Sequence, residues 1–442
     1  MKRPSLSVIG LGKLGSPFAA VMAAKGFRVI GVDKNPRFVQ AIDKGRPPVE
    51  EPFLQAFIKR GRARLSATRR TEEAVLASDV TFIIVPTPSG SDGLFSNKFV
   101  LEAVKEIGAA LRKKKERHVI VVTSTVMPGS SDGVIRAAIE KASGLKVGQG
   151  VGYCYNPEFI ALGNVIENML FPDFILIGES DARSGKLVSS IYKKVCGKDV
   201  AVERMALVNA EVTKLAINTF VTNKISYANM LADICERLPG GDVDVVSRAV
   251  GADTRVGRKY LKGATGFGGP CFPRDNIALA SLAHRLGARA DLPLATDRIN
   301  AWQTERLMRK LRKAVPKGAL IGLAGMAYKP DTSVIEKSAG MDLAQRLLKE
   351  RFSVRITDPL ATKEARKVLK GRVGIAEDIQ ALARHVDALV VLVPSAAFKK
   401  LNPRALSART QPLVILDCWR LYAGKNLGKK ARVISVGCGP AA

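Results

Sequence analysis

Short apolar runs that alternate with helical stretches constrain the fold of this chain more than any other feature of its sequence. One set of runs lies at residues 5–9, 28–32, 80–85, 119–123, 150–155 and 174–177. A second set lies at residues 320–323, 353–357, 388–393, 413–416 and 432–436. Strands separated by helices in this manner are typical of parallel sheets covered by helices. The sequence therefore predicts an α/β protein with two separate parallel-sheet regions.

The stretch between the two sets has a different pattern. From about residue 203 to residue 238 it has neither Gly nor Pro, and further helical sequence continues to about residue 312. A long, mostly apolar helix needs cover on several faces, so it is either a spacer or a dimerisation element. We expect a first domain at 1–202, a central helical region at 203–312 and a second α/β domain at 313–442.

Composition places the chain among ordinary globular proteins, with 47% hydrophobic and 25% charged residues. No apolar run approaches the roughly 20 residues of a membrane span, and the N-terminus leads into the first strand with no signal peptide. We therefore expect a soluble, cytoplasmic protein. The six cysteines are scattered without a CxxC pair, which indicates reduced thiols and neither a disulfide framework nor a metal site.

The net charge is extreme, at +30 from 70 basic and 40 acidic residues. The densest basic runs lie at residues 59–64 and 112–117. Such a balance suits a solvated basic surface, an anionic substrate or nucleic-acid binding. A few basic clusters without a nucleic-acid fold signature favour the solvated surface.

A glycine-rich turn follows the first strand-like run, as Gly10-Leu11-Gly12-Lys13-Leu14-Gly15. This GxGxxG spacing allows a tight turn, close approach of pyrophosphate to the backbone and helix–strand packing. The second strand ends in Asp33, whose carboxylate can accept hydrogen bonds from the ribose hydroxyls and repel a 2′-phosphate. The pattern predicts a Rossmann-type domain that binds NAD in preference to NADP, with Lys34 as an opposing signal.

A candidate nucleophile lies in the second unusual segment. Cys271 follows the glycine-rich residues 266–269 and precedes Arg274 and Asp275. Glycines let a substrate approach the backbone, and a neighbouring cation favours the reactive thiolate. A lone cysteine is more often a small buried apolar residue, so both interpretations stay open.

A polar stripe lies on the predicted long helix. Glu211, Lys214 and Asn218 are spaced to share one helical face. A lysine and an amide on one face can donate hydrogen bonds to a developing oxyanion. The alternative is a solvated stripe with a Glu–Lys pair.

These segments, taken in order, resemble the UDP-glucose/GDP-mannose dehydrogenase family over nearly the full length of the chain. The resemblance rests also on segments at residues 85–88, 124–129, 156–159, 255–262 and 325–330. It implies an NAD-dependent, four-electron oxidation of a nucleotide sugar to a carboxylic acid. The expected substrate is UDP-glucose; GDP-mannose and a UDP-N-acetylhexosamine are the alternatives, and a non-catalytic nucleic-acid-binding protein on the same scaffold is a remote one.

The resemblance also implies a role for each matching residue. Cys271 would form a covalent thiohemiacetal and then a thioester. The other implied catalytic residues are Lys214 and Asn218 for the oxyanions, Asp275 and Thr125 for protons and water, and Glu158 for thioester hydrolysis. Besides the glycine turn, the implied cofactor contacts are Asp33, Lys34, Thr87, Thr125 and Arg274. The implied substrate contacts are Glu158, Phe159, Lys214, Asn218, Tyr260, Leu261, Phe267, Gly268, Lys329 and Arg420, with Arg255 reaching the sugar from a partner subunit of a homodimer or larger oligomer.

The chain departs from the family pattern at several positions close to the implied contacts. Leu162 stands where an acidic residue is frequent, and Glu336 stands where the family has an arginine. Near the C-terminus Trp419 replaces the glycine of an Asp-Gly-Arg segment, with Arg420 beside it. The departures avoid the implied catalytic set, so the class of reaction is better supported by the sequence than the identity of the sugar.

Overall fold

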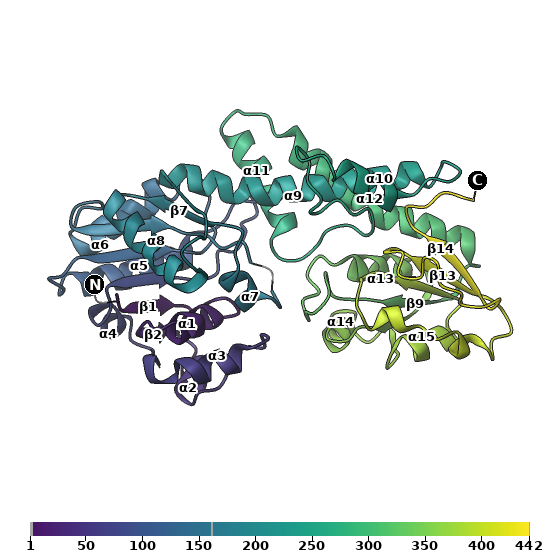
Figure 1. The fold of residues 1–442 in the computed structure, drawn as a ribbon, viewed down its shortest axis with the longest axis horizontal. Coiled ribbons are helices and arrows are strands. Elements are labelled where there is room, and N and C mark those ends of the chain that lie inside the picture. The colour runs from purple at the N-terminus through teal and green to yellow at the C-terminus, as the bar shows by residue number, and fades with distance from the viewer. Residues whose placement is uncertain (1–2, 161, 442) are drawn as a thin grey trace. The chain divides into compact units, whose positions relative to one another are not determined.

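The computed structural model describes residues 3–160 and 162–441, and the chain divides into two compact units, residues 1–216 and 217–442 (Figure 1). Each unit is built around one sheet, and the long helix α9 (Leu207–Cys235) contributes residues to both. The prediction of two parallel-sheet domains with an intervening helical region is confirmed. The division at 1–202, 203–312 and 313–442 stays a prediction.

The first unit holds an eight-stranded sheet in the order β3-β2-β1-β4-β5-β6-β7-β8. All neighbours are parallel except β6 and β7. Its strands are β1 (Leu6–Ile9), β2 (Val29–Val32), β3 (Leu65–Thr68), β4 (Val80–Ile83), β5 (His118–Val122), β6 (Val151–Tyr155), β7 (Ile175–Glu179) and β8 (Val202–Met205). The apolar runs did not indicate β3 or β8, because both are edge strands whose residues are only partly buried.

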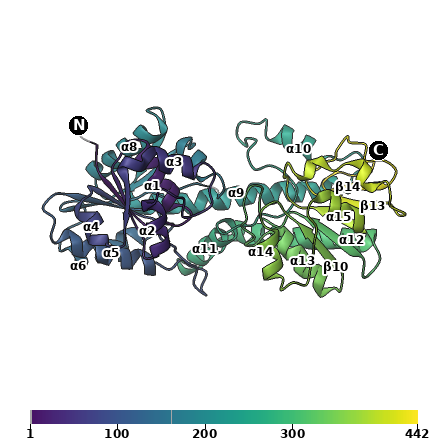
Figure 2. The ribbon, with the colours of Figure 1, turned by 90° about the horizontal axis from the view of Figure 1, so that it is seen from below.

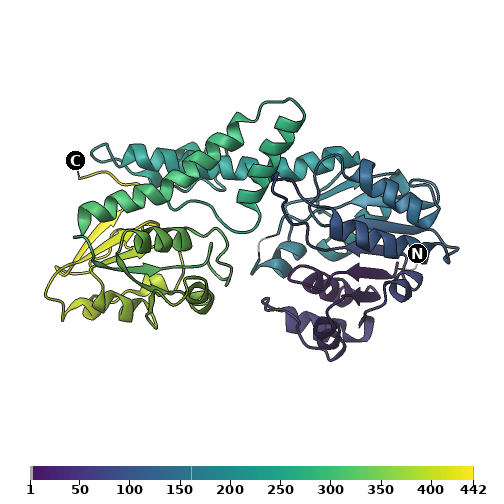
Figure 3. The same ribbon diagram turned by 180° about the vertical axis from the view of Figure 1, so that it is seen from behind.

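Helices cover both faces of this sheet (Figures 2 and 3). One face packs against α1 (Gly15–Ala24), α3 (Leu54–Gly61), α7 (Val165–Leu170) and α8 (Ala182–Cys196). The other packs against α4 (Thr71–Leu76), α5 (Lys98–Leu111), α6 (Arg136–Ser143) and the start of α9. The remaining helices are α2 (Pro36–Asp43), the short turn η1 (Arg62–Arg64) and the π-helical turn η2 (Ser131–Ile135). Burial on both faces explains why the central strands read as continuous apolar runs.

The second unit holds a six-stranded, fully parallel sheet in the order β11-β10-β9-β12-β13-β14. Its strands are β9 (Leu320–Ala324), β10 (Ser353–Thr357), β11 (Gly374–Ile375), β12 (Ala388–Val391), β13 (Leu413–Asp417) and β14 (Ala431–Ser435). Its helices are α10 (Val243–Val250), α11 (Phe272–Arg285), α12 (Asp291–Ala314), α13 (Ala339–Lys349), α14 (Thr362–Val368) and α15 (Ile379–His385), with short turns η3 (Phe398–Lys400) and η4 (Pro403–Leu406).

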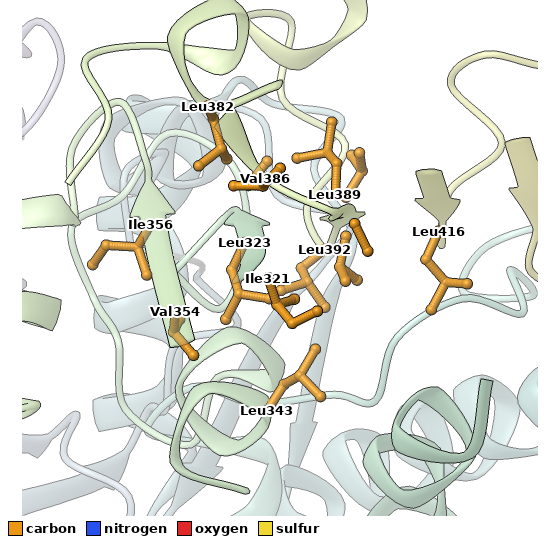
Figure 4. Packing of buried hydrophobic residues seen from close by; sticks show 14 of the residues in the cluster. Ile321, Leu323, Leu343, Val354, Ile356, Leu382, Val386, Leu389, Leu392 and Leu416 are labelled. Carbon is orange, nitrogen blue, oxygen red and sulfur yellow. The ribbon is translucent and has the colours of Figure 1, made fainter. Parts of the chain in front are cut away.

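The core of the second unit lies between its sheet and the covering helices. Ile321 and Leu323 of β9 pack with Leu343 of α13 and with Leu382 and Val386 at α15 (Figure 4). Side-chain caps mark where several helices begin: Ser338 accepts from the Met341 N–H at α13, and Asp378 accepts from the Ala381 N–H at α15.

Within the described residues, no helix combines the length and apolar character needed to cross a membrane.

Candidate active site

The glycine turn after β1 has the geometry that its spacing predicts. Gly10 has φ +97, and a Cβ there would collide with the Ile84 carbonyl; a Cβ at Gly15 would collide with the Gly10 carbonyl. Among the described residues, a Cβ at Gly12 would meet no atom within 4 Å. The first and third glycines are therefore required by the turn and by helix packing, whereas the second leaves room for a ligand to approach the backbone. Lys13 and Leu14 complete the turn, and α1 begins at Gly15 with no described side chain capping its first turn.

Asp33 joins the glycine turn to the end of β2. Its Oδ2 accepts a 2.7 Å hydrogen bond from the Leu11 N–H, and its Oδ1 accepts one of 2.7 Å from the Asn35 N–H. A carboxylate has about four acceptor positions, so two remain for ribose hydroxyls. The open backbone at Gly12 and this acceptor capacity fit NAD. Lys34 has a different partner: its ammonium lies 3.1 Å from Glu102, which raises the pKa of Lys34.

Two loops at the carboxyl ends of β4 and β5 are tied together beside this turn. The Ser124 hydroxyl donates to the Val85 carbonyl at 2.6 Å and accepts from the Val85 N–H at 2.9 Å. These bonds hold the segment that carries buried Thr87 against the segment that carries partly buried Thr125. The carboxyl ends of strands at a switch in strand order are where open α/β sheets bind their ligands.

Glu211 anchors the segment that follows Thr125. This fully buried carboxylate accepts hydrogen bonds from the N–H groups of Gly129, at 2.7 Å, and Ser131, at 2.8 Å. Burial raises the pKa of Glu211, and the two N–H donors oppose that shift. Glu211 is bonded to residues of the segment at Gly129 and Ser131, where the π-helical turn begins, and the Glu–Lys pair considered for the helical stripe therefore does not describe its main contacts.

Lys214 and Glu158 meet within the first unit. The Lys214 ammonium donates to the Glu158 carbonyl at 2.6 Å and lies 4.5 Å from the centre of the Phe159 ring. Burial raises the pKa of the Glu158 carboxyl, while any hydrogen bond that the Tyr192 hydroxyl donates to the carboxylate and the charge of Lys214 oppose the shift. The sequence did not indicate a functional role for Tyr192, because a tyrosine on the apolar face of a helix is expected to be a core residue.

Cys271 lies at the amino end of α11 in the second unit. It is exposed, whereas the other five cysteines are buried or partly buried. Its carbonyl accepts the Asp275 N–H at 2.9 Å, and the amino end of a helix is an environment that favours a nucleophilic thiolate. The interpretation as a buried apolar residue is therefore wrong for Cys271.

Asn218 and Asp275 meet in the same unit. The Asn218 amide donates to the Asp275 carboxylate at 2.6 Å, and Asp275 is 1% exposed. The Arg274 guanidinium lies 3.7 Å from the other carboxylate oxygen. The neighbouring Asn276 donates to Asp297 at 2.8 Å, so polar groups continue along this face of α11.

The glycine-rich loop before Cys271 packs on the start of the second α/β region. The Gly269 N–H donates to the Glu336 carbonyl at 2.9 Å, and a Cβ at Gly268 would collide with the Lys337 carbonyl. Both polar groups of the Asn300 amide bond to the backbone of Phe267. Leu261 is buried beside this loop, and the exposed ring of Tyr260 contacts Phe272 edge-on at 6.4 Å. Glu336 therefore contributes its backbone to the loop.

Lys329 lines a pocket of about 180 Å³ at the carboxyl ends of β9, β10 and β12. The other lining residues are Pro330, Asp331, Thr332, Asp358, Pro359, Leu360, Val393, Ser395 and Phe398. Arg255 lies elsewhere, on the loop after α10, where its exposed guanidinium pairs with Asp253 at 2.6 Å. Its implied role toward a partner subunit stays a prediction.

Arg420 is built into the protein interior. It is 8% exposed, its Nε and Nη2 donate to the Asp244 carboxylate, and its Nη1 donates to the carbonyls of Gly263 and Val436. These contacts tie the β14 region to the central helices and give Arg420 a structural role, and the expected substrate contact stays a prediction. The departure at Trp419 belongs to the same core, where its indole N–H donates to the Leu392 carbonyl at 2.8 Å. Leu162 packs against the core of the first unit.

The structure thus assembles the implied residues in two groups. In the first unit the glycine turn is joined to Asp33, the loop of Thr87 is tied to that of Thr125, and Lys214 contacts Glu158. The second unit brings together Asn218, Asp275 and Cys271, with the loop at 266–269 against residues 328–337. The groups that the sequence did not reveal are Tyr192, Glu211 as an anchor, and Asp358. For Asp358 a signal existed, because an acidic residue ends the second strand of each α/β region.

Comparison with known proteins agrees with this assembly. Profiles of the UDP-glucose/GDP-mannose dehydrogenase family match the chain as its NAD binding domain at residues 4–196, its central domain at 208–302 and its UDP binding domain at 322–424. The chain is 35% identical to the UDP-glucose 6-dehydrogenase AglM of Haloferax volcanii, over 82% of this chain and 85% of that one. It is 33% identical to the GDP-mannose 6-dehydrogenase of Pseudomonas aeruginosa, over 87% of each chain.

A solved structure extends the likeness to three dimensions. The UDP-glucose dehydrogenase of Pyrobaculum islandicum superposes with a TM-score of 0.89 at 34% identity, over 99% of this chain and 98% of that one. The three matched segments follow one another in the order of the predicted regions and span most of the chain. The protein therefore belongs to the UDP-glucose/GDP-mannose dehydrogenase family and is an NAD-dependent oxidoreductase.

Proposed function

We propose that the protein oxidises UDP-glucose to UDP-glucuronate through a covalent intermediate on Cys271. The observation that carries the proposal is the exposed Cys271 thiol at the amino end of α11, in the unit that also holds the Asn218–Asp275 pair. The similar proteins from Haloferax volcanii and Pyrobaculum islandicum support UDP-glucose as the substrate.

The proposed chemistry oxidises one carbon twice. NAD supplies the hydride acceptors, one molecule for each of the two oxidations. The sugar C6 alcohol loses a hydride and a proton to become an aldehyde, and the Cys271 thiolate adds to that carbon to give a thiohemiacetal. Loss of a second hydride and of the hydroxyl proton gives a thioester. Water then adds to the thioester, the carbon–sulfur bond breaks, and the carboxylate and the Cys271 thiol are released.

The chain's own polar residues support the charges that develop in these steps. The ammonium of Lys214 and the amide of Asn218 are donors suited to an oxyanion. Asp275, which accepts from Asn218, and Thr125, with a water, are suited to moving protons. Glu158 is suited to assisting the attack of water on the thioester. Lys329 offers a cation to the nucleotide diphosphate at the pocket in the second sheet region.

A homodimer formed through α9 belongs to the same proposal. Phe220 is 63% exposed, and Tyr227, Met230 and Ile234 are also exposed on this helix. Monomeric proteins rarely leave a contiguous apolar stripe uncovered. In such a dimer the exposed Arg255 would be available to the sugar of the partner subunit.

Substitution of the nucleophile tests the covalent step. We expect purified protein to form two NADH for each UDP-glucose consumed, with UDP-glucuronate as the product, and Cys271→Ser to form no acid. The measurement combines NADH absorbance with product analysis by mass spectrometry. Cys438→Ser is the matched control, because Cys438 is a partly buried thiol outside the proposed site, and it should retain the ratio.

Other outcomes of that assay have definite meanings. Glucuronate formation by Cys271→Ser at the wild-type rate would refute the covalent role. A much faster turnover of GDP-mannose would replace the proposed substrate, and the similarity to the Pseudomonas aeruginosa GDP-mannose 6-dehydrogenase makes that nucleotide sugar the second candidate. UDP-N-acetylhexosamines complete the panel.

A further inference from the structure

Three polar side chains form a short chain of oxygens next to the Lys214–Glu158 contact. The Tyr192 hydroxyl oxygen lies 2.6 Å from Asn156 Oδ1 and 2.8 Å from Glu158 Oε1. Tyr192 and Asn156 are each 1% exposed. Asn156 follows β6, and Tyr192 lies on α8, so two separate elements fix the positions of the groups around the Glu158 carboxyl.

The orientation of the Asn156 amide is determined by its other contact. Asn156 Nδ2 donates a 2.8 Å hydrogen bond to the Leu176 carbonyl, so the amide oxygen must be the atom that faces Tyr192. An amide oxygen only accepts hydrogen bonds. The short contact to Asn156 therefore requires the single hydroxyl proton of Tyr192.

The contact between Tyr192 and Glu158 then needs another proton. A hydroxyl has one proton to donate and can accept through its lone pairs. If Glu158 were ionised, either Asn156 Oδ1 or the Glu158 carboxylate would face the Tyr192 oxygen at hydrogen-bonding distance with no proton between them. If Glu158 carries a proton, the carboxyl donates to Tyr192 and Tyr192 donates to Asn156, and both contacts are satisfied.

We propose that Glu158 is a neutral carboxylic acid in the resting protein, and that Tyr192 is the positioning residue whose hydroxyl accepts a hydrogen bond from this acid. The direction of the pKa shift agrees, because burial raises the pKa of Glu158. The charged and titratable groups of the first unit around this carboxyl are Lys214, Tyr192 and Cys196. Cys196 is itself neutral near pH 7, since burial and then Glu158 raise the pKa of its thiol to about 11.

Glu211 provides a matched contrast within the same unit. Glu211 is fully buried, whereas Glu158 is partly buried, and the Glu211 carboxylate accepts from the N–H groups of Gly129 and Ser131, which can only donate. Donors favour an ionised carboxylate, whereas the hydroxyl–amide chain at Glu158 favours a protonated one. The two glutamates are therefore expected to differ in protonation because their hydrogen-bond partners differ.

The catalytic meaning of this state rests on the proposed function. A carboxylic acid must release its proton before it can act as a base on the water that attacks the thioester. The ionised fraction of Glu158 grows as the pH rises, so the hydrolysis step should accelerate with pH through the pKa of Glu158. At neutral pH the same carboxyl is available as a proton donor.

Infrared spectroscopy of protein labelled with ¹³C-glutamate tests the protonation state without using activity. At pH 7 we expect a carboxylic-acid C=O band that is absent in Glu158→Gln and present in Glu211→Gln. Tyr192→Phe should keep the band and move it to higher frequency, because the acid loses its hydrogen-bond acceptor. Folding of each variant is checked by circular dichroism.

Asn156→Leu separates this role from simple packing. This variant removes the amide oxygen that accepts the hydrogen bond of the Tyr192 hydroxyl. Tyr192 can then donate to an ionised Glu158, and we expect the pKa of Glu158 to fall by about one to two units. The band should weaken at pH 7, and the pH profile of thioester hydrolysis should shift to lower pH. Absence of any band that depends on Glu158 in folded wild-type protein would overturn the proposal. If the protein shows the band but does not oxidise UDP-glucose, this inference stands and only the proposed function is overturned.

Discussion

The two sheet regions use the same backbone turn at the end of their first strand. Gly10 and Gly325 both have positive φ, +97 and +109, and a Cβ at either position would collide with the chain beside it. The Gly10 N–H donates to the Val32 carbonyl at 2.8 Å, and the Gly325 N–H donates to the Thr357 carbonyl at 2.9 Å. In each region an aspartate, Asp33 or Asp358, ends the neighbouring strand and accepts from the turn.

The two aspartates differ in how much of their acceptor capacity the protein uses. Asp33 accepts from two backbone N–H groups. Asp358 accepts from four, those of Met326, Ala327, Leu360 and Ala361, at 2.8 to 3.0 Å. Since a carboxylate has about four acceptor positions, Asp358 has none left for a ribose.

The helices that follow the two turns also differ in whether the protein itself caps their first turn. α1 begins directly after the turn without a described side-chain cap, whereas α13 begins only after residues 326–338 and is capped by buried Ser338. One turn therefore offers its backbone and its carboxylate to a ligand, while the other uses both internally.

The largest expected difference between the two units is their sensitivity to acid. His118 of β5 is 1% exposed, its Nε2 lies 2.7 Å from Thr81 Oγ1, and burial lowers its pKa from 6.5 to about 3. The imidazole is neutral in the fold and protonates at higher pH in the unfolded chain. Its contribution to stability is full above pH 6.5 and is lost as the pH falls from 6.5 toward 3, by up to about 5 kcal/mol.

The two tryptophans make this difference measurable. Trp302 and Trp419 both lie in the second unit, so tryptophan fluorescence reports that unit, while far-ultraviolet circular dichroism reports both. On acidification we expect the dichroism to change before the fluorescence. His118→Gln should remove most of the difference in pH between the dichroism transition and the fluorescence transition. His284→Gln, at an exposed position, should leave that difference unchanged. Simultaneous transitions in wild type would contradict the prediction.

Matched substitutions of the two aspartates should have opposite consequences. In Asp358→Asn an amide N–H₂ group faces backbone N–H donors, and we expect a loss of about 2–3 kcal/mol in the free energy of unfolding with NAD affinity retained. In Asp33→Asn we expect a smaller loss of stability and about tenfold weaker NAD binding, with a narrower gap between NAD and NADP. Denaturant titration and calorimetry give the two quantities. Equal effects of both variants on NAD binding would break the comparison.

The smallest expected effect concerns the cap of α13. Ser338→Ala removes the hydroxyl that accepts from the Met341 N–H and donates to the Met326 carbonyl at 2.7 Å. We expect a loss of about 1–2 kcal/mol, observed by tryptophan fluorescence during denaturation, and unchanged NAD binding. Ser338→Thr, which keeps a hydroxyl, should recover part of the stability. A weaker affinity for NAD in Ser338→Ala would show that the two turns are not separate in function.

The sequence predicted the parts of the site that depend on local backbone geometry. Gly10, Gly12 and Gly15 could be assigned because a turn with positive φ and a close backbone approach tolerates no Cβ, and Asp33 because a strand leads into it. Cys271 remained open between a nucleophile and a buried apolar residue. Its exposure excludes the buried apolar residue, and exposure depends on what the rest of the chain places around it. The role of Cys271 as nucleophile stays a prediction.

Side chains whose role depends on distant partners could not be predicted. Lys34 was expected near the cofactor, which stays a prediction, but its ion pairs with Glu102 and Glu106 of α5 were not indicated by the sequence. Arg420 was expected to contact substrate, which stays a prediction, but its bonds to Asp244, Gly263 and Val436 were not indicated by the sequence. Long cationic side chains reach many positions, so their partners are set by packing and not by sequence spacing.

What the sequence by itself determined is therefore the α/β class, the glycine turn with its aspartate, and the membership of the family. Those features follow from the period of apolar residues and from backbone conformations that few residue types can adopt. Only the tertiary structure decided that Asp33 keeps acceptors for a ligand while Asp358 uses its own, and that Tyr192 and Asn156 surround Glu158. Hydrogen-bond saturation and proton sharing are properties of groups far apart in the chain, and folding alone brings them within bonding distance.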